Sequence, residues 1–216
     1  MMLLGLPLVA LIAGLVLVGL YISNVCYDYG TPQYISRKIG HGVGGVGYLL
    51  CALMFSSPWY PLIISGGFTL LLGGARLLRP STFRGVGGSS RRHALAEIWY
   101  PLAGTVSLIA GWAWLGSPWL GVLPALYLGF GDAVTGLTRS WHCKKEKKGW
   151  CGTFSMLVVC LLVSQFLQPY WIGFIMAVTA TLAERLTPMS RGWMDDNWTL
   201  VISSALVGSI LYVYFG

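Results

Sequence analysis

Long apolar runs, separated by short polar segments, fill most of this 216-residue chain. Hydrophobic residues make up 56% of the sequence and charged residues only 10%, whereas a soluble domain carries roughly a quarter charged residues. We therefore predict an all-α, polytopic integral membrane protein with short loops and one transmembrane domain over residues 1–216. A run of about 20 residues crosses roughly 30 Å of hydrocarbon. On that basis the expected spans are eight: 3–23, 38–56, 59–77, 95–115, 118–138, 150–168, 170–187 and 197–215.

The basic residues predict how these spans are oriented. All fourteen Lys and Arg residues fall in four segments between alternate spans, at 37–38, 76–92, 139–148 and 185–191. The intervening turns at 57–59, 117–119 and 168–171 carry no charge and are rich in Pro, Trp and Tyr. Cationic loops stay on the cytoplasmic side, and Trp and Tyr prefer the headgroup level. We therefore expect the charged loops in the cytoplasm and both termini on the opposite side.

The net charge of +7 comes from these loops. Such a field suits anionic membrane lipids, or an anionic substrate such as a nucleotide. No loop is long enough to form a nucleic-acid-binding domain, so nucleic acid is not an expected partner. The oligomeric state is left open, a homodimer included. The five cysteines show no paired spacing, so we expect ordinary free thiols.

Carboxylates occur where an apolar span makes them unfavourable. Glu97, Asp132 and Glu184 lie inside predicted spans, and Asp196 adjoins the last one. A carboxylate at mid-span costs roughly 2.5–3.5 kcal/mol on insertion scales, and such residues usually mark a functional site. All of them fall in the predicted cytoplasmic half, whereas a transporter relay would place some at the midplane. We expect them to converge; the alternative for each is a simple ion pair with a neighbouring Arg.

Helical spacing indicates that these acids face inward. Each shares a helix face with small or polar residues, which suits a packed interior better than lipid. The faces are Glu97 with Tyr100, Pro101 and Gly104; Asp132 with Gly129, Thr135, Gly136 and Arg139; and Glu184 with Ala177, Ala180 and Thr181.

Basic groups are expected at the same depth. Arg37, Lys38 and His41 occupy the first turns of the second span, and four lysines lie between Trp141 and Trp150. Backbone amides at the start of the following helix, joined by a lysine, form a plausible phosphate cradle. Carboxylates bind Mg²⁺, and Mg²⁺ bridges polyphosphates. The pattern therefore indicates phosphoryl or nucleotidyl transfer to a lipid at the membrane surface.

Four ordered segments resemble the polyprenol kinase family, which includes dolichol kinase and phytol kinase. They cover most of the chain, from about residue 36 to residue 200, and Cys151 stands where the family usually has Glu. The segments are Ser-Arg-Lys-Ile-Gly-His-Gly-Val-Gly at 36–44, Gly-Asp-Ala-Val-Thr-Gly at 131–136, Lys-Gly-Trp-Cys-Gly-Thr at 148–153, and Ala-Thr-Leu-Ala-Glu at 180–184 followed by Asp-Asn-Trp-Thr at 196–199.

The resemblance implies a membrane kinase that moves the γ-phosphoryl of a nucleoside triphosphate, typically CTP, onto the terminal hydroxyl of an isoprenoid alcohol. The prenyl tail would then lie between spans. We predict a metal site, a nucleotide site and a pair of residues that orient or deprotonate the hydroxyl. The candidates are Asp132, Asp196 and Glu184 for Mg²⁺; Lys148, Arg139, Lys144, Gly152, Thr153, Arg37 and Lys38 for the nucleotide; His41 and Glu97 for the hydroxyl; and Asn197 as a further matching polar position.

Three other functions remain open from sequence. A lipid cytidylyltransferase would use the same groups but release pyrophosphate. A small transporter would show flux without nucleotide consumption. A non-catalytic scaffold is the third, and the clustered acids argue against it.

Overall fold

The computed structural model describes residues 2–87, 95–143, 149–187 and 196–216. Within these residues the chain is helical with no strand, which confirms the predicted all-α class. The elements are α1 (Met2–Asp28), α2 (Gln33–Met54), α3 (Trp59–Leu78), α4 (Arg84–Gly87), α5 (Ala96–Ser107), η1 (Leu108–Trp114), α6 (Pro118–Leu126), η2 (Tyr127–Asp132), α7 (Ala133–Thr138), η3 (Arg139–Cys143), α8 (Trp150–Ser164), α9 (Tyr170–Leu186) and α10 (Asp196–Phe215).

Several of these elements continue into one another. The π-helical segment η1 extends α5, and η2, α7 and η3 extend α6 into one rod over Pro118–Cys143. Within the described ranges each predicted span therefore coincides with one long helical rod. By length and composition, four segments could cross a membrane: Gly5–Asp28, Trp59–Leu78, Pro118–Trp141 and Asn197–Phe215. A polytopic membrane protein is thus confirmed, while the count of eight spans stays a prediction.

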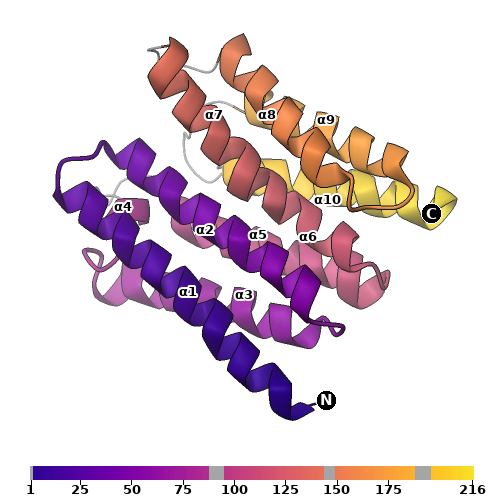
Figure 1. The fold of residues 1–216 in the computed structure, drawn as a ribbon, viewed down its shortest axis with the longest axis horizontal. Helices are drawn as coiled ribbons and strands as arrows, with labels where there is room; N and C mark the ends of the chain where they lie inside the picture. The colour runs from indigo at the N-terminus through magenta and orange to yellow at the C-terminus, as the bar shows by residue number, and fades with distance from the viewer. Residues whose placement is uncertain (1, 88–94, 144–148, 188–195) are drawn as a thin grey trace.

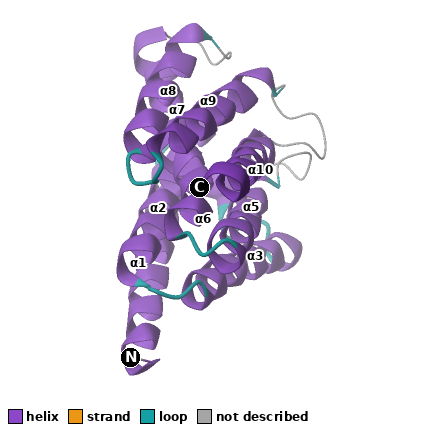
Figure 2. Ribbon diagram, turned by 90° about the vertical axis from the view of Figure 1, so that its right-hand side faces the viewer, coloured by secondary structure: helices purple, strands orange, loops and turns teal. Residues whose placement is uncertain are grey.

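The rods form an elongated bundle (Figure 1). Helices α1, α2 and α3 lie on one side, α7, α8 and α9 on the other, and α5 and α6 between them; Figure 2 shows the same order in the perpendicular view. Both chain termini lie at the end of the bundle opposite α4 (Figure 1). The short α4 therefore lies at the end of the bundle where α2 and α5 begin.

The burial pattern suits a bundle whose outer surface meets lipid. Large apolar side chains are exposed on the outer helices, such as Leu70 on α3 and Phe154 on α8. The rod of α6 and η2 is instead central, and its residues from Leu120 to Gly129 are all buried. Asp132 ends η2, so this central rod carries a carboxylate into the interior.

One expectation about the cysteines is wrong. Cys26, Cys51 and Cys160 are free thiols, as predicted, but Cys151, at the start of α8, is disulfide-bonded. Spacing along the chain did not reveal this pairing, because no recognised cysteine motif surrounds it.

Candidate functional site

Asp132 is the centre of a buried polar cluster. Its Oδ2 atom accepts a hydrogen bond from His41 Nδ1 at 2.9 Å and forms a short ion pair with the Lys38 ammonium. All three side chains are at least nine-tenths buried. A buried charge is tolerated only when it is paired and hydrogen-bonded. The cluster therefore joins two residues of α2 to one that lies about 90 residues later in the chain.

Two glycine contacts bring these helices close enough for that cluster. A Cβ atom on Gly129 would lie 2.6 Å from the Gly45 Cα, so the α2 and η2 backbones touch there. A Cβ atom on Gly136 would lie 2.7 Å from Cε of Lys38. Gly129 and Gly136 stand about one turn before and one turn after Asp132 on the same rod. Small residues permit such close approach between membrane helices.

The chemistry of Asp132 determines which hydrogen His41 donates. A carboxylate held by an ammonium accepts hydrogen bonds and donates none, so Nδ1 of His41 carries the hydrogen. The ring also packs edge-on against Tyr100, with centroids 5.2 Å apart. Nε2 is buried and has no hydrogen-bond partner among the described residues. His41 is therefore oriented at one nitrogen and available at the other.

An apolar pocket begins at His41. It lies between α1, α2, α3, α4 and α5. His41, Glu97 and Tyr100 form part of its wall. Leu20, Ile64, Phe68 and Leu72 are among the apolar side chains that form the rest.

Glu97 is held by a neighbouring helix. Its Oε1 lies 3.5 Å from Nη1 of Arg76 on α3, and the same guanidinium nitrogen donates to the Gly87 carbonyl at 3.2 Å. The Glu97 side chain is almost fully buried. Its second oxygen, Oε2, has no hydrogen-bond partner in the described part of the chain. The sequence left open a simple ion pair between Glu97 and a neighbouring Arg. Among the described residues, such a pair exists at Oε1 but not at Oε2.

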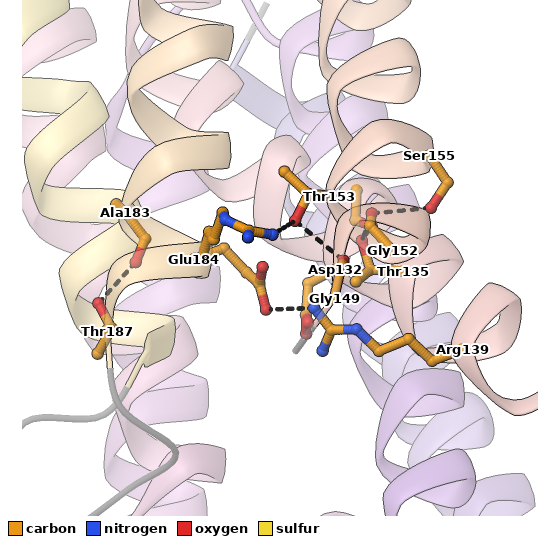
Figure 3. A network of polar contacts seen from close by, with 12 residues as sticks. Asp132, Thr135, Arg139, Gly149, Gly152, Thr153, Ser155, Ala183, Glu184 and Thr187 are labelled. Carbon is orange, nitrogen blue, oxygen red and sulfur yellow. Dashed lines mark hydrogen bonds and ion pairs between the residues drawn. The ribbon is translucent and has the colours of Figure 1, made fainter. Parts of the chain in front are cut away.

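A second polar group lies farther along the central rod (Figure 3). Arg139 Nη2 donates to Glu184 Oε1 at 3.0 Å, across from η3 to α9. One turn earlier, Thr135 donates to the Gly152 carbonyl at 3.2 Å, which ties α7 to α8. Arg185 donates to Thr153 Oγ1 at 3.2 Å. These contacts join α7, η3, α8 and α9 at one level.

Arg185 also stacks over the ring of Trp150, 3.8 Å from its centroid. Gly152 is tightly packed, because a Cβ atom there would lie 2.5 Å from Nε of Arg139. Gly152 and Thr153, predicted to contact nucleotide, therefore contact arginines in this structure.

The predicted site residues thus divide into two groups. Asp132, Lys38 and His41 meet, with Glu97 on the same pocket, while Arg139 and Glu184 pair separately. Arg37 is half-buried on α2, and its Nε atom has no partner among the described residues. Asn197 is buried near the start of α10 and makes contacts. Lys144, Lys148 and the side chain of Asp196 lie outside the described part of the structure.

The described carboxylates of the predicted Mg²⁺ site already have partners within the protein. Asp132 is engaged by Lys38 and His41, and Glu184 by Arg139. Among the described residues, no group of three His, Cys, Asp or Glu side chains is arranged to hold a metal. Mg²⁺ normally takes one or two carboxylates plus substrate phosphates. The predicted ligand set of Asp132, Glu184 and Asp196 stays a prediction, because the Asp196 side chain lies outside the described residues.

Sequence reasoning missed several residues that shape the site. Arg76 was assigned only to loop charge, yet it holds Glu97. Tyr100 was noted only as a face neighbour, yet its ring packs on His41. The available signal was helical spacing: Glu97, Tyr100 and Pro101 were predicted to share a face, and all three line the pocket.

Comparison with curated proteins supports the resemblance drawn from the motifs. The chain is 28% identical over 200 residues to a protein named Phytol kinase from Synechocystis sp. (strain ATCC 27184 / PCC 6803 / Kazusa). The similarity covers 85% of this chain and 83% of that protein, so it extends over most of both chains. No family model and no solved structure matches the chain. The similarity supports a polyprenol- or phytol-kinase-like family.

Proposed function

We propose that this protein is a membrane-embedded kinase that transfers the γ-phosphoryl of a nucleoside triphosphate to the terminal hydroxyl of an isoprenoid alcohol. One observation carries the proposal: His41 belongs both to the buried Asp132 cluster and to the wall of an apolar pocket. A catalytic base held in orientation by a carboxylate is thereby next to space suited to a lipid. The similarity to Phytol kinase points to the same substrate class.

The chemical step follows from the hydrogen assigned to His41. The alcohol hydroxyl donates to Nε2 and its oxygen attacks the γ-phosphorus. The new O–P bond forms as the bond from the γ-phosphorus to the bridging oxygen of the β-phosphate breaks. The hydroxyl proton passes to Nε2, and the imidazolium that results is stabilised by Asp132, to which Nδ1 donates. The products are a prenyl phosphate and a nucleoside diphosphate.

Phosphoryl transfer depends mainly on positioning and on neutralising charge. Lys38 is ion-paired with Asp132, so its positive charge lies beside the proposed base, and Arg37 adds a second positive charge on the same helix turn. Mg²⁺, with Asp132, Asp196 and Glu184 as its predicted ligands, would neutralise phosphate charge when bound. CTP is the donor we expect, from the family resemblance.

Arg139 and Arg185 lie in the second polar group, where the central rod meets α8 and α9. Each is engaged within the protein, Arg139 with Glu184 and Arg185 with Thr153. We propose that nucleotide phosphates compete for these guanidinium groups on binding, because a bidentate Arg–phosphate contact is as favourable as an Arg–carboxylate contact.

The test is direct. Purified protein in nanodiscs is incubated with phytol, Mg²⁺ and CTP, ATP or UTP labelled at the γ-phosphate. The expected products are labelled phytyl phosphate and unlabelled nucleoside diphosphate, in a ratio of one to one. Release of pyrophosphate with a nucleotidyl-lipid product would establish the cytidylyltransferase instead. No nucleotide consumption with any prenol would remove the kinase proposal.

A further inference from the structure

Two residues of the pocket wall carry buried polar atoms that lack a hydrogen-bond partner among the described residues. Most polar side chains in its wall are already hydrogen-bonded within the protein. Tyr48 and Ser65 bond each other at 2.5 Å, and Tyr100 donates to the Ala125 carbonyl at 3.1 Å. The buried side-chain nitrogen and oxygen atoms left without a partner in this wall, among the described residues, are His41 Nε2 and Glu97 Oε2.

These two atoms can be satisfied by a ligand that donates a hydrogen bond. His41 and Glu97 are each more than nine-tenths buried, and an unsatisfied buried polar atom costs about 1–3 kcal/mol. Nε2 and Oε2 are both acceptors when His41 is neutral and Glu97 is ionised. A hydroxyl group can donate to one of them and, after rotation, to the other. A plain hydrocarbon or a phospholipid acyl chain can satisfy neither.

The rest of the pocket is shaped for a chain. On α2, its wall runs from His41 through Gly44 and Tyr48 to Cys51, ten residues or about 15 Å of helix rise. The Tyr48–Ser65 bond places Ile64 of α3 beside the far part of this wall. Glu97 lies in the first turn of α5 and His41 about two turns into α2, so these polar atoms are at one end of the stretch of α2 that lines the pocket and Cys51 is at the other.

We propose that this pocket holds the isoprenoid chain of the acceptor alcohol, with the hydroxyl between His41 and Glu97 and the chain extending towards Cys51 and Ile64. The inference rests on the proposed function for the identity of the alcohol. It adds where the substrate binds, that Glu97 positions the hydroxyl, and that Ile64 limits the length of chain accepted.

Adjacent residues on α3 provide a matched pair for the test. Ile64 is buried and lines the pocket, whereas the Ile63 side chain is 59% exposed on the outer surface. Ile64→Trp fills the far end of the pocket, and Ile63→Trp adds the same volume facing lipid. Binding is measured without nucleotide, by photo-crosslinking of a diazirine-bearing phytol analogue to the full-length protein in nanodiscs, with competition by geraniol, farnesol, geranylgeraniol and phytol.

We expect Ile64→Trp to weaken competition by phytol and geranylgeraniol about tenfold or more while leaving geraniol unchanged, since a few methylenes in an apolar pocket discriminate by that factor. Ile63→Trp should behave as wild type. Ile64→Ala widens the same end and should relax the preference in the opposite direction, which keeps the test valid if the Trp variant does not fold. Equal effects at both positions, or labels outside α1–α5, would overturn the assignment.

A separate competition experiment tests whether His41 and Glu97 bind the hydroxyl. Phytane has the carbon skeleton of phytol without the hydroxyl, and should compete much more weakly than phytol against the wild type. Glu97→Leu should reduce that discrimination. Equal competition by phytane, or by phospholipid alone, would show a general acyl-chain pocket and contradict the proposal.

The two proposals fail in different ways. Labelling in the pocket without any phosphoryl transfer by the wild type would refute the kinase and leave the alcohol site standing. Phosphoryl transfer with labels on the outer faces of α8–α10 would support the kinase and refute the alcohol site in this pocket.

Discussion

At the scale of single residues, the contribution of a carboxylate ion pair to stability depends on how deeply the pair is buried. Asp28 and Arg84 form a half-exposed pair at 3.2 Å, and such pairs contribute about 0–1 kcal/mol. Asp132 and Glu184 form pairs that are almost fully buried. In these, removing one partner weakens the compensation of a charge held in a low-dielectric interior.

Asp132→Asn tests the role of this carboxylate in orienting His41. The amide can still accept from Nδ1, but it carries no charge to stabilise the imidazolium. We expect kcat to fall about 10²–10⁴-fold, with KM for prenol and for nucleotide little changed. Steady-state kinetics on the purified variant measures this, and Asp28→Asn is the control that should retain activity. An unchanged kcat would exclude His41–Asp132 as the base.

Arg139→Met tests whether the Arg139–Glu184 pair stabilises the bundle. The single variant leaves Glu184 buried beside an apolar side chain, and such a change costs about 3–5 kcal/mol. The double variant Arg139→Met/Glu184→Gln should be more stable than Arg139→Met alone, because it also removes the buried negative charge that lost its Arg139 partner. Thermal unfolding in detergent gives the comparison. If the single variant is as stable as the wild type, the pair has no structural role.

At the scale of elements, the helices were predictable and their partners less so. Apolar runs and turn residues predicted each long helix within a few residues, and Asp132 stood out because a span rarely carries a carboxylate. Spacing also predicted inward faces, and Ala177, Ala180 and Thr181 are indeed buried with Glu184. Spacing does not specify which neighbour a face meets. Lys38 was predicted to contact the nucleotide, which stays a prediction, but its pairing with Asp132 could not be predicted from spacing.

The pocket was not predictable for a related reason. Ile64 lines it and Ile63 faces outward, but both are apolar residues of one span and the sequence does not distinguish them. The π-helical segments were also missed. Turns of this kind occur often at functional sites, and η2 ends at Asp132.

Gly129→Ala tests whether close approach of α2 and η2 builds the Asp132 cluster. The added methyl would lie 2.6 Å from a backbone atom, Gly45 Cα, so the helices must separate. We expect a fall in kcat of about tenfold or more, because small misplacements of catalytic groups have effects of that size or larger. Gly42→Ala on α2 is the control, since no described atom lies within 4 Å of its Cβ position. Equal activity in the two variants would refute the account.

At the scale of the whole molecule, the site, the pocket and the charge pattern indicate the same end of the bundle as the one that meets the nucleotide. The polar end of the pocket lies at the start of α5 and about two turns into α2, beside α4 and the described cations Lys38 and Arg76. A soluble nucleotide would therefore meet a membrane-bound alcohol at that end, without the alcohol leaving the bilayer. The termini lie at the opposite end (Figure 1).

This arrangement makes a prediction about orientation. The positive-inside rule places α4 and the basic segments in the cytoplasm, so the end of α10 should face away from it. In a bacterial host, alkaline phosphatase fused after Gly216 should be active and green fluorescent protein fused there should be dark. A fusion after Leu78, at the end of α3 next to the basic segment, should give the reverse pair of signals. If the fusion after Gly216 were fluorescent, the nucleotide end of the site would face away from cytoplasmic nucleotides. The kinase proposal would then need a different nucleotide source, because the polar end of the pocket and the chain terminus lie at opposite ends of one bundle.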